Sequence, residues 1–321
     1  MLSLVSGCRL TSGGLHLGHY LGCLSPLDIF DKPYKYYFVL TDVSPTEKKV
    51  IHKEMNSDLL LIASILLSTK YSERIKIILQ SDLQESAPNL LSLIQDITTL
   101  NQLEHVHPQK LEIKQRCSKL NINDFLFPIQ QTFCSTALNA NYILMNDDNS
   151  RIVHFSRKIV RKINNVHGST FSLPYLKHGI IPRLLGFNYK KMSKNNHNCI
   201  FLTDSSEEVR GKVRQLFKYR YYPDHYKLSD DFLPFLYLRA FNQREEKEII
   251  IADFKSGKME LDHFIEYVFL SIEELIKPIR QGCKVNQENK NYILRKIKED
   301  TREACTEARL SENKLIEVLL R

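Results

Sequence analysis

Two histidines and two lysines stand in short motifs that could handle the phosphates of a nucleotide. The first motif, SGGLHLGHY, places His16 and His19 three residues apart at the start of a predicted helix, with Gly18 between them. Side chains three residues apart share one helix face, and the amides of a helix N-terminus attract anions. The two histidines could therefore donate hydrogen bonds to a triphosphate and stabilise charge during attack on its α-phosphorus.

The second motif, KKMSKNN, lies where the first, strand-containing half of the chain gives way to a helical half. In it, Lys191 and Lys194 flank a Met-Ser pair on a polar loop. Such a loop can close over a leaving pyrophosphate and supply positive charge there. Taken alone, each motif also has an ordinary explanation, as incidental histidines on a helix or as a solvated basic loop.

Strands that alternate with helices must position the first motif. Four β-rich runs are expected, at Leu2–Ser6, Tyr34–Asp42, Ile75–Ser81 and Tyr142–Met145. Between them, helical periodicity is found at His16–Asp28, Lys53–Leu67, Ala87–Thr99 and Arg151–Asn164. Apolar strands alternating with helices are typical of βαβ units, so the pattern predicts an α/β fold with a parallel, doubly wound sheet.

The strand signal ends after about Asp204, and the remaining segments have helical periodicity. Gly257, Pro278 and Gly282 are expected to punctuate these helices. The sequence therefore predicts a Rossmann catalytic domain at residues 1–188, a motif loop at 189–202 and a helical C-terminal domain at 203–321.

Together, the two motifs resemble the HIGH and KMSKS signatures of class I aminoacyl-tRNA synthetases. Longer runs resemble the tryptophanyl-tRNA synthetase family over nearly the whole chain: LVSGCRLTSGGLHLGHYLGCL, IILQSDLQESAPNLLSLIQDITTLNQLEH, MSKNNHNCIFLTDSSEEVRGKVRQLF, ELIKPIRQ and TREACTEAR. In that family the last two segments belong to the helices that receive the tRNA anticodon.

The resemblance implies a Rossmann (HUP-type) catalytic domain, a homodimer, Mg2+ with ATP, and adenylation of an amino acid followed by transfer to tRNA. It assigns His16, His19, Lys191 and Lys194 to catalysis. The implied ATP contacts are Arg9, Ser12, Gly13, Gly14, His16, Gly18, His19, Asp148, Lys191, Met192, Ser193 and Lys194. The implied substrate contacts are Phe127, Gln131, Cys134, Asp148 and Asn149.

The chain departs from the family at the end of the site that reads the amino acid. Phe127 stands where the family has a tyrosine that contacts the substrate amine. Cys134 stands where an aspartate accepts the indole N–H, and a thiol is a poor acceptor by comparison. Asn149 stands at the glutamine of the family's G-x-D-Q motif. Another acceptor, Asp124 or Gln131, would be needed for tryptophan.

Three interpretations of the chain stay open. The first is a tryptophan–tRNA ligase that has compensated for these changes. The second is a paralogue that activates a different acid for a biosynthetic pathway without tRNA. The third is a catalytically silent RNA-binding or regulatory protein on a synthetase scaffold.

Composition adds limits on partners and location. The 321 residues carry a formal charge of +8, which is compatible with RNA. Basic residues cluster on two predicted helices, at Arg157–Lys162 and Arg295–Arg302, as they would for RNA contact or for solvated faces. No membrane span is expected. Seven scattered cysteines, without a CxxC pair, indicate neither a disulfide framework nor a zinc site, and so favour the cytoplasm. His105 and His107 are not expected to bind metal.

Overall fold

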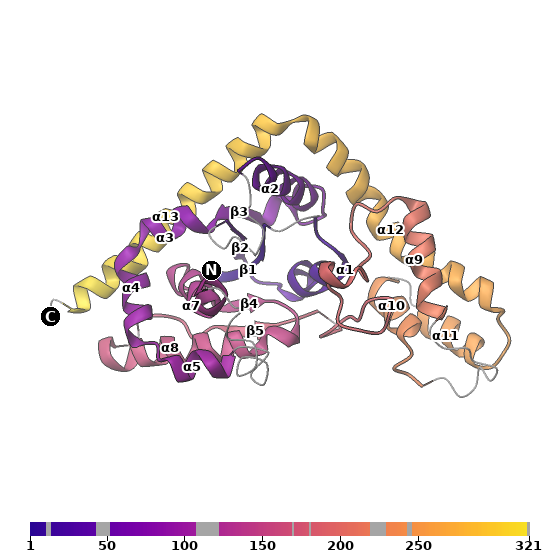
Figure 1. Cartoon of the computed structure of the whole chain (residues 1–321), viewed down its shortest axis with the longest axis horizontal. Coiled ribbons are helices and arrows are strands. Elements are labelled where there is room, and N and C mark those ends of the chain that lie inside the picture. The colour runs from indigo at the N-terminus through magenta and orange to yellow at the C-terminus, as the bar shows by residue number, and fades with distance from the viewer. Residues whose placement is uncertain are drawn as a thin grey trace.

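A five-stranded parallel sheet lies at the centre of the catalytic half (Figure 1). The computed structural model describes residues 1–10, 14–42, 52–106, 122–168, 170–179, 181–218, 229–242 and 246–319. The strand order is β3-β2-β1-β4-β5, and every pairing is parallel. The strands are β1 (Leu2–Arg9), β2 (Tyr34–Thr41), β3 (Ile75–Leu79), β4 (Tyr142–Leu144) and β5 (Tyr175–Lys177).

This order confirms the predicted doubly wound α/β fold. The four predicted strands are all present, whereas β5 was not predicted from the sequence. With three residues and no buried side chain, β5 has no apolar run that could identify it. It joins the sheet by pairing with β4, from Tyr142 opposite Tyr175 to Leu144 opposite Lys177.

Strand β2, which lies between β3 and β1, is buried on both faces, as an interior strand of a parallel sheet should be. Its side chains alternate between two separate hydrophobic clusters. Tyr36, Phe38 and Leu40 belong to the first cluster, and Tyr37 and Val39 belong to the second. The first cluster continues into the C-terminal helices, so one core joins the two halves of the chain.

Helices cover the sheet and form the C-terminal half. In the catalytic half they are α1 (Leu17–His19), α2 (His52–Leu67), α3 (Gln80–Ser86), α4 (Pro88–Ile97), α5 (Leu100–Val106), α7 (Ile122–Ala137) and α8 (Ser150–His167). In the C-terminal half they are α9 (Ser206–Lys218), α10 (Leu233–Phe241), α11 (Lys247–Lys255), α12 (Leu261–Glu288) and α13 (Lys290–Leu319).

Two predicted helix boundaries were wrong. The helix expected over His16–Asp28 is divided into α1, a π-helical turn at Tyr20–Leu24 and a 3-10 turn at Ser25–Ile29. Helix α12 runs through Pro278 and Gly282 without ending. Its packing against α2 outweighs the poor helix propensity of those residues, and a Cβ on Gly282 would lie 2.9 Å from the Ser68 side chain.

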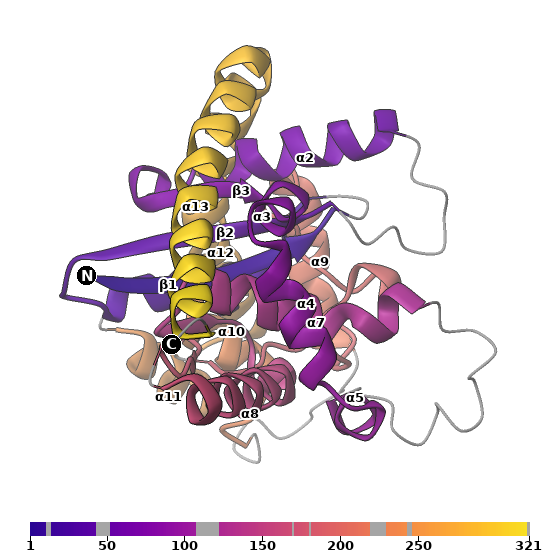
Figure 2. The ribbon, with the colours of Figure 1, turned by 90° about the vertical axis from the view of Figure 1, so that its left-hand side faces the viewer.

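Helix α13 turns back from the helical half and crosses the catalytic half, as Figures 1 and 2 show. The buried Asp300 side chain accepts a hydrogen bond from the Ile77 amide at 2.9 Å, and the Thr301 hydroxyl accepts one from the Leu79 amide at 3.2 Å. Both amides belong to edge strand β3. Helix α13 therefore caps a sheet edge that would otherwise expose unpaired donors.

Near its C-terminal end, α13 also caps another helix. The Glu312 carboxylate accepts hydrogen bonds from the amides of Asn89 and Leu90, at 2.6 and 3.0 Å. These amides form the first turn of α4, whose N-terminal donors have no partner within the helix. In the part of the chain that the structure describes, no helix is long and apolar enough to cross a membrane.

Candidate active site

The two motif histidines hold each other and the start of α1 in place. The His16 Nδ1 atom accepts a hydrogen bond from the Gly18 amide at 3.1 Å. In turn, His19 Nδ1 accepts one from the His16 amide at 3.2 Å, and the two ring centroids lie 3.9 Å apart. Since each Nδ1 is an acceptor, each neutral ring carries its proton on Nε2. Both Nε2 groups are therefore donors.

The surroundings keep both imidazoles neutral. Burial lowers the pKa of His16 to about 3, and the nearby Lys194 ammonium lowers it further. The pKa of His19 is also well below its usual value because of burial, with additional effects from His16 and Lys194. At neutral pH the pair therefore offers hydrogen bonds to a phosphate without carrying charge itself.

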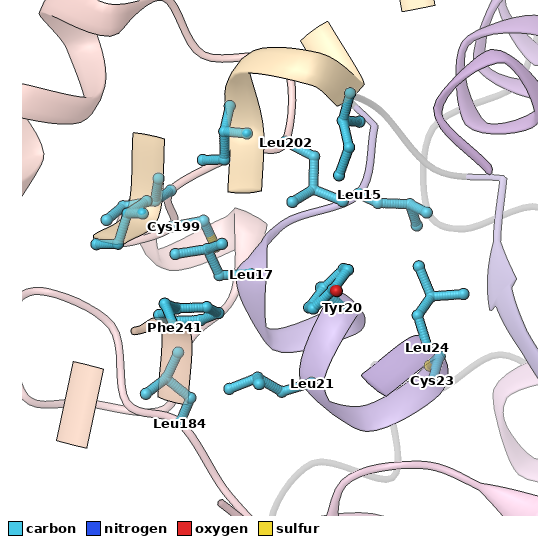
Figure 3. Packing of buried hydrophobic residues seen from close by; sticks show 14 of the residues in the cluster. Leu15, Leu17, Tyr20, Leu21, Cys23, Leu24, Leu184, Cys199, Leu202 and Phe241 are labelled. Carbon is cyan, nitrogen blue, oxygen red and sulfur yellow. The ribbon is translucent and has the colours of Figure 1, made fainter. Parts of the chain in front are cut away.

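The residues around the histidines anchor the motif in the core. Leu15 and Leu17 point into a buried cluster with Cys199 and Leu202 (Figure 3). Two backbone hydrogen bonds join the same segments: Leu17 N to Ile200 O at 3.0 Å, and Leu202 N to Leu15 O at 2.9 Å. The HLGH motif is thereby fixed to the segment that follows the lysine motif.

The side chain of buried Asn198 forms hydrogen bonds with the backbone of the lysine motif. Its Oδ1 accepts the Ser193 amide at 2.9 Å, and its Nδ2 donates to the Lys191 carbonyl at 3.0 Å. The same Nδ2 donates to Asn188 Oδ1 at 2.7 Å. Asn198 is completely buried, and its hydrogen bonds with the Ser193 amide and the Lys191 carbonyl fix the path of the KMSK backbone.

Gly18 brings the two motifs into direct contact. A Cβ at this position would lie 2.9 Å from His16 Cε1 and 3.3 Å from Met192 Sδ. Only glycine leaves both neighbours where they are. The close packing of HLGH against Met192 therefore depends on this residue type.

A cavity of about 290 Å³ opens between the motifs, the strand ends and α7. It is lined by Val5, Ser6, Gly7, Arg9, His16, Gly18, His19, Cys23, Phe127, Gln131, Ser135, Ile143, Met145, Asn146, Asn149, Ile152, Arg183, Leu184, Lys191 and Met192. Its position at the carboxyl ends of β1 and β4 is where doubly wound sheets bind ligands.

Nine of the predicted contacts line this cavity together: Arg9, His16, Gly18, His19, Phe127, Gln131, Asn149, Lys191 and Met192. Lys194 is not among the lining residues, but its charge acts on both histidines and on Cys8. Gly14 has a φ of 59° and packs near Ile65 instead. Ser193 serves the loop through its amide.

Other predicted residues do not line the cavity, or they lie outside the residues that the structure describes. Cys134 is buried in the second hydrophobic cluster, and it is Ser135 that lines the cavity from the same helix. Burial raises the pKa of the Cys134 thiol to about 12, so it stays protonated. Ser12, Gly13 and His107 lie outside the described residues, as do the side chains of Asp124 and Asp148.

Sequence reasoning missed three residues of the site. Asn146, three residues before Asn149, donates from Nδ2 to the Gly18 carbonyl at 3.0 Å. Arg183 lines the cavity from a segment without a motif. Asn198 follows the KMSK motif by only four residues, and its burial is the signal that a single sequence does not reveal.

Comparison with known proteins decides the family. The family model described as tRNA synthetases class I (W and Y) matches residues 1–275. The chain belongs to that family. It is a ligase of the class I aminoacyl-tRNA synthetase type, with the Rossmann-type fold of those enzymes.

Curated relatives span almost the whole of this tryptophanyl-tRNA synthetase-like chain. The tryptophan–tRNA ligase of Streptococcus mutans is 28% identical over 326 residues, covering 95% of this chain and 94% of the relative. That of Treponema pallidum is 25% identical over 338 residues, covering 99% and 97%.

Solved structures share the fold. The tryptophanyl-tRNA synthetase of Mycoplasma pneumoniae has a TM-score of 0.82 at 17% identity and covers 100% of this chain and 98% of its own. The tyrosyl-tRNA synthetase of Archaeoglobus fulgidus, solved with L-tyrosine, has a TM-score of 0.69 at 20% identity, covering 88% and 90%.

Proposed function

We propose that this protein uses ATP to activate a carboxylic acid as an acyl-adenylate in the cavity described above. The observation that carries the proposal is the junction of the two motifs through Leu17, Ile200, Leu15 and Leu202. This junction holds neutral histidine donors and the cationic loop against one cavity. A positioned set of donors and cations is what phosphoryl transfer requires of a protein.

In the proposed reaction a carboxylate oxygen of the substrate attacks the α-phosphorus of ATP. The bond from that phosphorus to the bridging oxygen breaks, and pyrophosphate leaves with the electron pair. His16 and His19 donate their Nε2 protons as hydrogen bonds to phosphate oxygens, and no proton is transferred. Lys191 and Lys194 balance the charge that moves onto pyrophosphate.

Mg2+ is proposed to enter with ATP, bound mainly through the phosphates. Among the described residues there is no group of three or more histidine, cysteine or acidic side chains that could hold a metal ion. This fits a metal whose ligands are phosphate oxygens and water, as is usual for Mg2+ with nucleotides. The ion would neutralise part of the charge on the leaving group.

The acid is proposed to differ from tryptophan. The names of the curated relatives favour tryptophan. Against it, Phe127 has no hydroxyl, and the predicted indole-reading position, Cys134, belongs to the core. Gln131 and Ser135 of the same helix line the cavity, whereas Cys134 does not. A site that binds a buried substrate donor, such as the indole N–H, through a hydrogen-bond acceptor discriminates strongly against other substrates. Loss of that acceptor therefore changes substrate specificity. A compensated tryptophan enzyme is the alternative.

Transfer to tRNA is proposed with α8 as a contact. Exposed Arg151, Lys158 and Arg161 lie on this helix, and the first two also line a hollow shared with α5. By contrast, Arg157 and Lys162 already donate to the Pro174 and Ile97 carbonyls. Without an acceptor tRNA, the adenylate would instead serve a biosynthetic pathway.

Assembly, domain division and location also stay proposals. We expect a homodimer in the cytoplasm, as the resemblance implies. A single hydrophobic cluster spans the division at residues 188 and 203. We therefore propose that the division separates functions and not independently packed domains.

Exchange of labelled pyrophosphate into ATP tests the proposal, with the twenty amino acids and related carboxylic acids, with and without tRNA. Activation predicts acid-dependent exchange. No exchange with any acid would favour the third interpretation, a silent RNA-binding or regulatory homologue. Exchange with tryptophan alone would overturn altered specificity.

The Lys194→Ala variant links exchange to the loop. We expect exchange to fall about a hundredfold, because removing one transition-state charge partner typically costs ~3 kcal/mol. Folding should change little, which thermal unfolding can check. An unchanged exchange rate would remove Lys194 from the proposed chemistry.

A further inference from the structure

The Asn146 side chain reaches from the end of β4 to the turn that carries the HLGH motif. Its Nδ2 donates to the Gly18 carbonyl at 3.0 Å. A Cβ on Gly22 would lie 2.7 Å from Asn146 Oδ1 and 2.9 Å from Asn146 N. Residues four apart share one face of a helical turn, and here both are glycines. Because neither has a side chain, Asn146 lies directly against the backbone of the motif.

The peptide between Gly18 and His19 is held at both of its polar atoms. The His19 amide donates to the His16 carbonyl at 2.8 Å, and the Gly18 carbonyl accepts from Asn146. Glycine can adopt many backbone angles, so a peptide that follows it needs outside contacts to fix its plane. Helix α1 supplies little restraint, because after three residues it passes into the π-helical turn at Tyr20–Leu24. Asn146 therefore sets the direction in which the backbone enters His19.

Asn146 also begins the turn that carries predicted substrate contacts. It is the N-cap residue of the 3-10 turn Asp147–Asn149, and its carbonyl accepts the Asn149 amide at 3.1 Å. Asn149 lines the same cavity as His19. Through its side chain and its backbone, Asn146 joins the predicted phosphate motif to the turn beside the substrate.

The oxygen of the Asn146 amide faces protein. Its Oδ1 atom is buried and has no hydrogen-bond partner among the described residues. An oxygen buried against Gly22 cannot accept a hydrogen bond from a substrate unless the turn opens. The amide therefore acts through its contact with Gly18.

We propose that Asn146 is a positioning residue, which fixes the peptide between Gly18 and His19 and thereby aims His19 at the nucleotide phosphates. The inference rests on the proposed adenylation. A misdirected donor weakens the transition state more than it weakens substrate binding, because its contribution depends on accurate alignment. Loss of Asn146 should therefore lower the maximal rate of exchange and leave the KM values for ATP and for the acid nearly unchanged.

Asn146→Ala and Asn141→Ala compare the two ends of β4. Asn141 accepts from the Ser3 amide at 2.8 Å and donates to Ser172 Oγ at 3.3 Å. Asn146→Ala should lower the maximal exchange rate at least about tenfold and change either KM less than about threefold. Asn141→Ala should lower the urea midpoint but change exchange less than about twofold. Equal maximal rates for the two variants, or a change in KM alone for Asn146→Ala, overturns the inference.

Gly22→Ala reaches the same contact without changing Asn146. The added Cβ would lie too close to Asn146 Oδ1, so the Asn146 side chain must move away from Gly18. The maximal exchange rate should again fall about tenfold. This variant tests the inference even if Asn146→Ala does not fold. Normal exchange in Gly22→Ala contradicts the positioning role.

A double-mutant cycle with His19 tests how Asn146 acts. In the His19→Ala background, Asn146→Ala should change exchange less than about threefold, because residues that act as one unit do not contribute additively. If the two effects multiply instead, Asn146 does not act through His19. Absence of acid-dependent exchange in the unaltered protein contradicts the proposed function itself, whereas normal exchange in Asn146→Ala contradicts this inference alone.

Discussion

At the scale of single residues, the site depends on fixed neutral histidines and on close approach at Gly18. The tautomers of His16 and His19 follow from two backbone hydrogen bonds that occupy Nδ1. The motif itself predicted that these side chains meet a phosphate. It could not predict their protonation, because the burial and the Lys194 charge that lower each pKa come from distant segments.

Gly18→Ala tests the close approach. The added Cβ would lie 2.9 Å from His16 Cε1, so His16 and Met192 must move. We expect exchange to fall at least a hundredfold and stability to fall by about 1–3 kcal/mol.

Gly211→Ala is the matched control for this change. Gly211 lies in α9, and a Cβ there would meet nothing within 4 Å. It should stabilise the protein by about 0.5–1 kcal/mol through helix propensity and leave exchange unchanged. Normal exchange in the Gly18→Ala variant would contradict the account of the motif contact.

At the scale of elements, the alternation of strands and helices was predictable from the sequence. The contacts that hold the two motifs in place were not. Four of the strands, and the helices that alternate with them along the chain, follow from local apolar periodicity. Asn198, the backbone pairing of Leu17 with Ile200, and the π-helical turn at Tyr20–Leu24 depend on segments that meet only in the fold. The placement of Cys134 in the core also required the rotation of α7, which its periodicity did not fix.

Asn198→Ala tests the positioning of the lysine loop. It removes the hydrogen bonds of the Asn198 side chain with the Ser193 amide, the Lys191 and Lys190 carbonyls and Asn188 Oδ1. The Lys191 carbonyl then keeps only the weaker hydrogen bond from Asn196. Stability should fall by about 1–3 kcal/mol, as for a buried polar partner. Exchange should fall at least tenfold, mainly through kcat, because we propose that the loop acts in the transition state.

Asn196→Ala serves as the control within the same loop. Asn196 is exposed and donates a single 3.3 Å hydrogen bond to the Lys191 carbonyl. We expect less than a twofold change in exchange. Equal effects of the two variants, measured by exchange and by urea unfolding, would show that Asn198 has no special positioning role.

At the scale of the whole molecule, helix α13 ties the helical half to the catalytic half (Figure 2). The resemblance predicted that the TREACTEAR segment serves the anticodon. In the structure, Thr301, Ala304, Cys305 and Ala308 of that segment are buried against the catalytic half. Its helical character was predictable from periodicity, whereas its partner was not, because capping of β3 requires the long return of the chain.

Glu312→Ala tests the contact between α13 and the first turn of α4. The variant leaves the first-turn amides of α4 without their acceptor, so the free energy of unfolding should fall by about 1–2 kcal/mol. Glu317→Ala, an exposed change on the same helix, should have an effect within ~0.5 kcal/mol. Equal urea midpoints for the two variants would contradict the capping role.

The fate of one oxygen atom tests the central claim most directly. An acid that supports exchange is labelled with 18O in its carboxylate and allowed to turn over with ATP, with hydroxylamine capturing the acyl group. Attack on the α-phosphorus predicts AMP carrying one 18O atom and unlabelled pyrophosphate, measured by mass spectrometry. Formation of ADP, or label in phosphate or pyrophosphate with unlabelled AMP, would contradict adenylation.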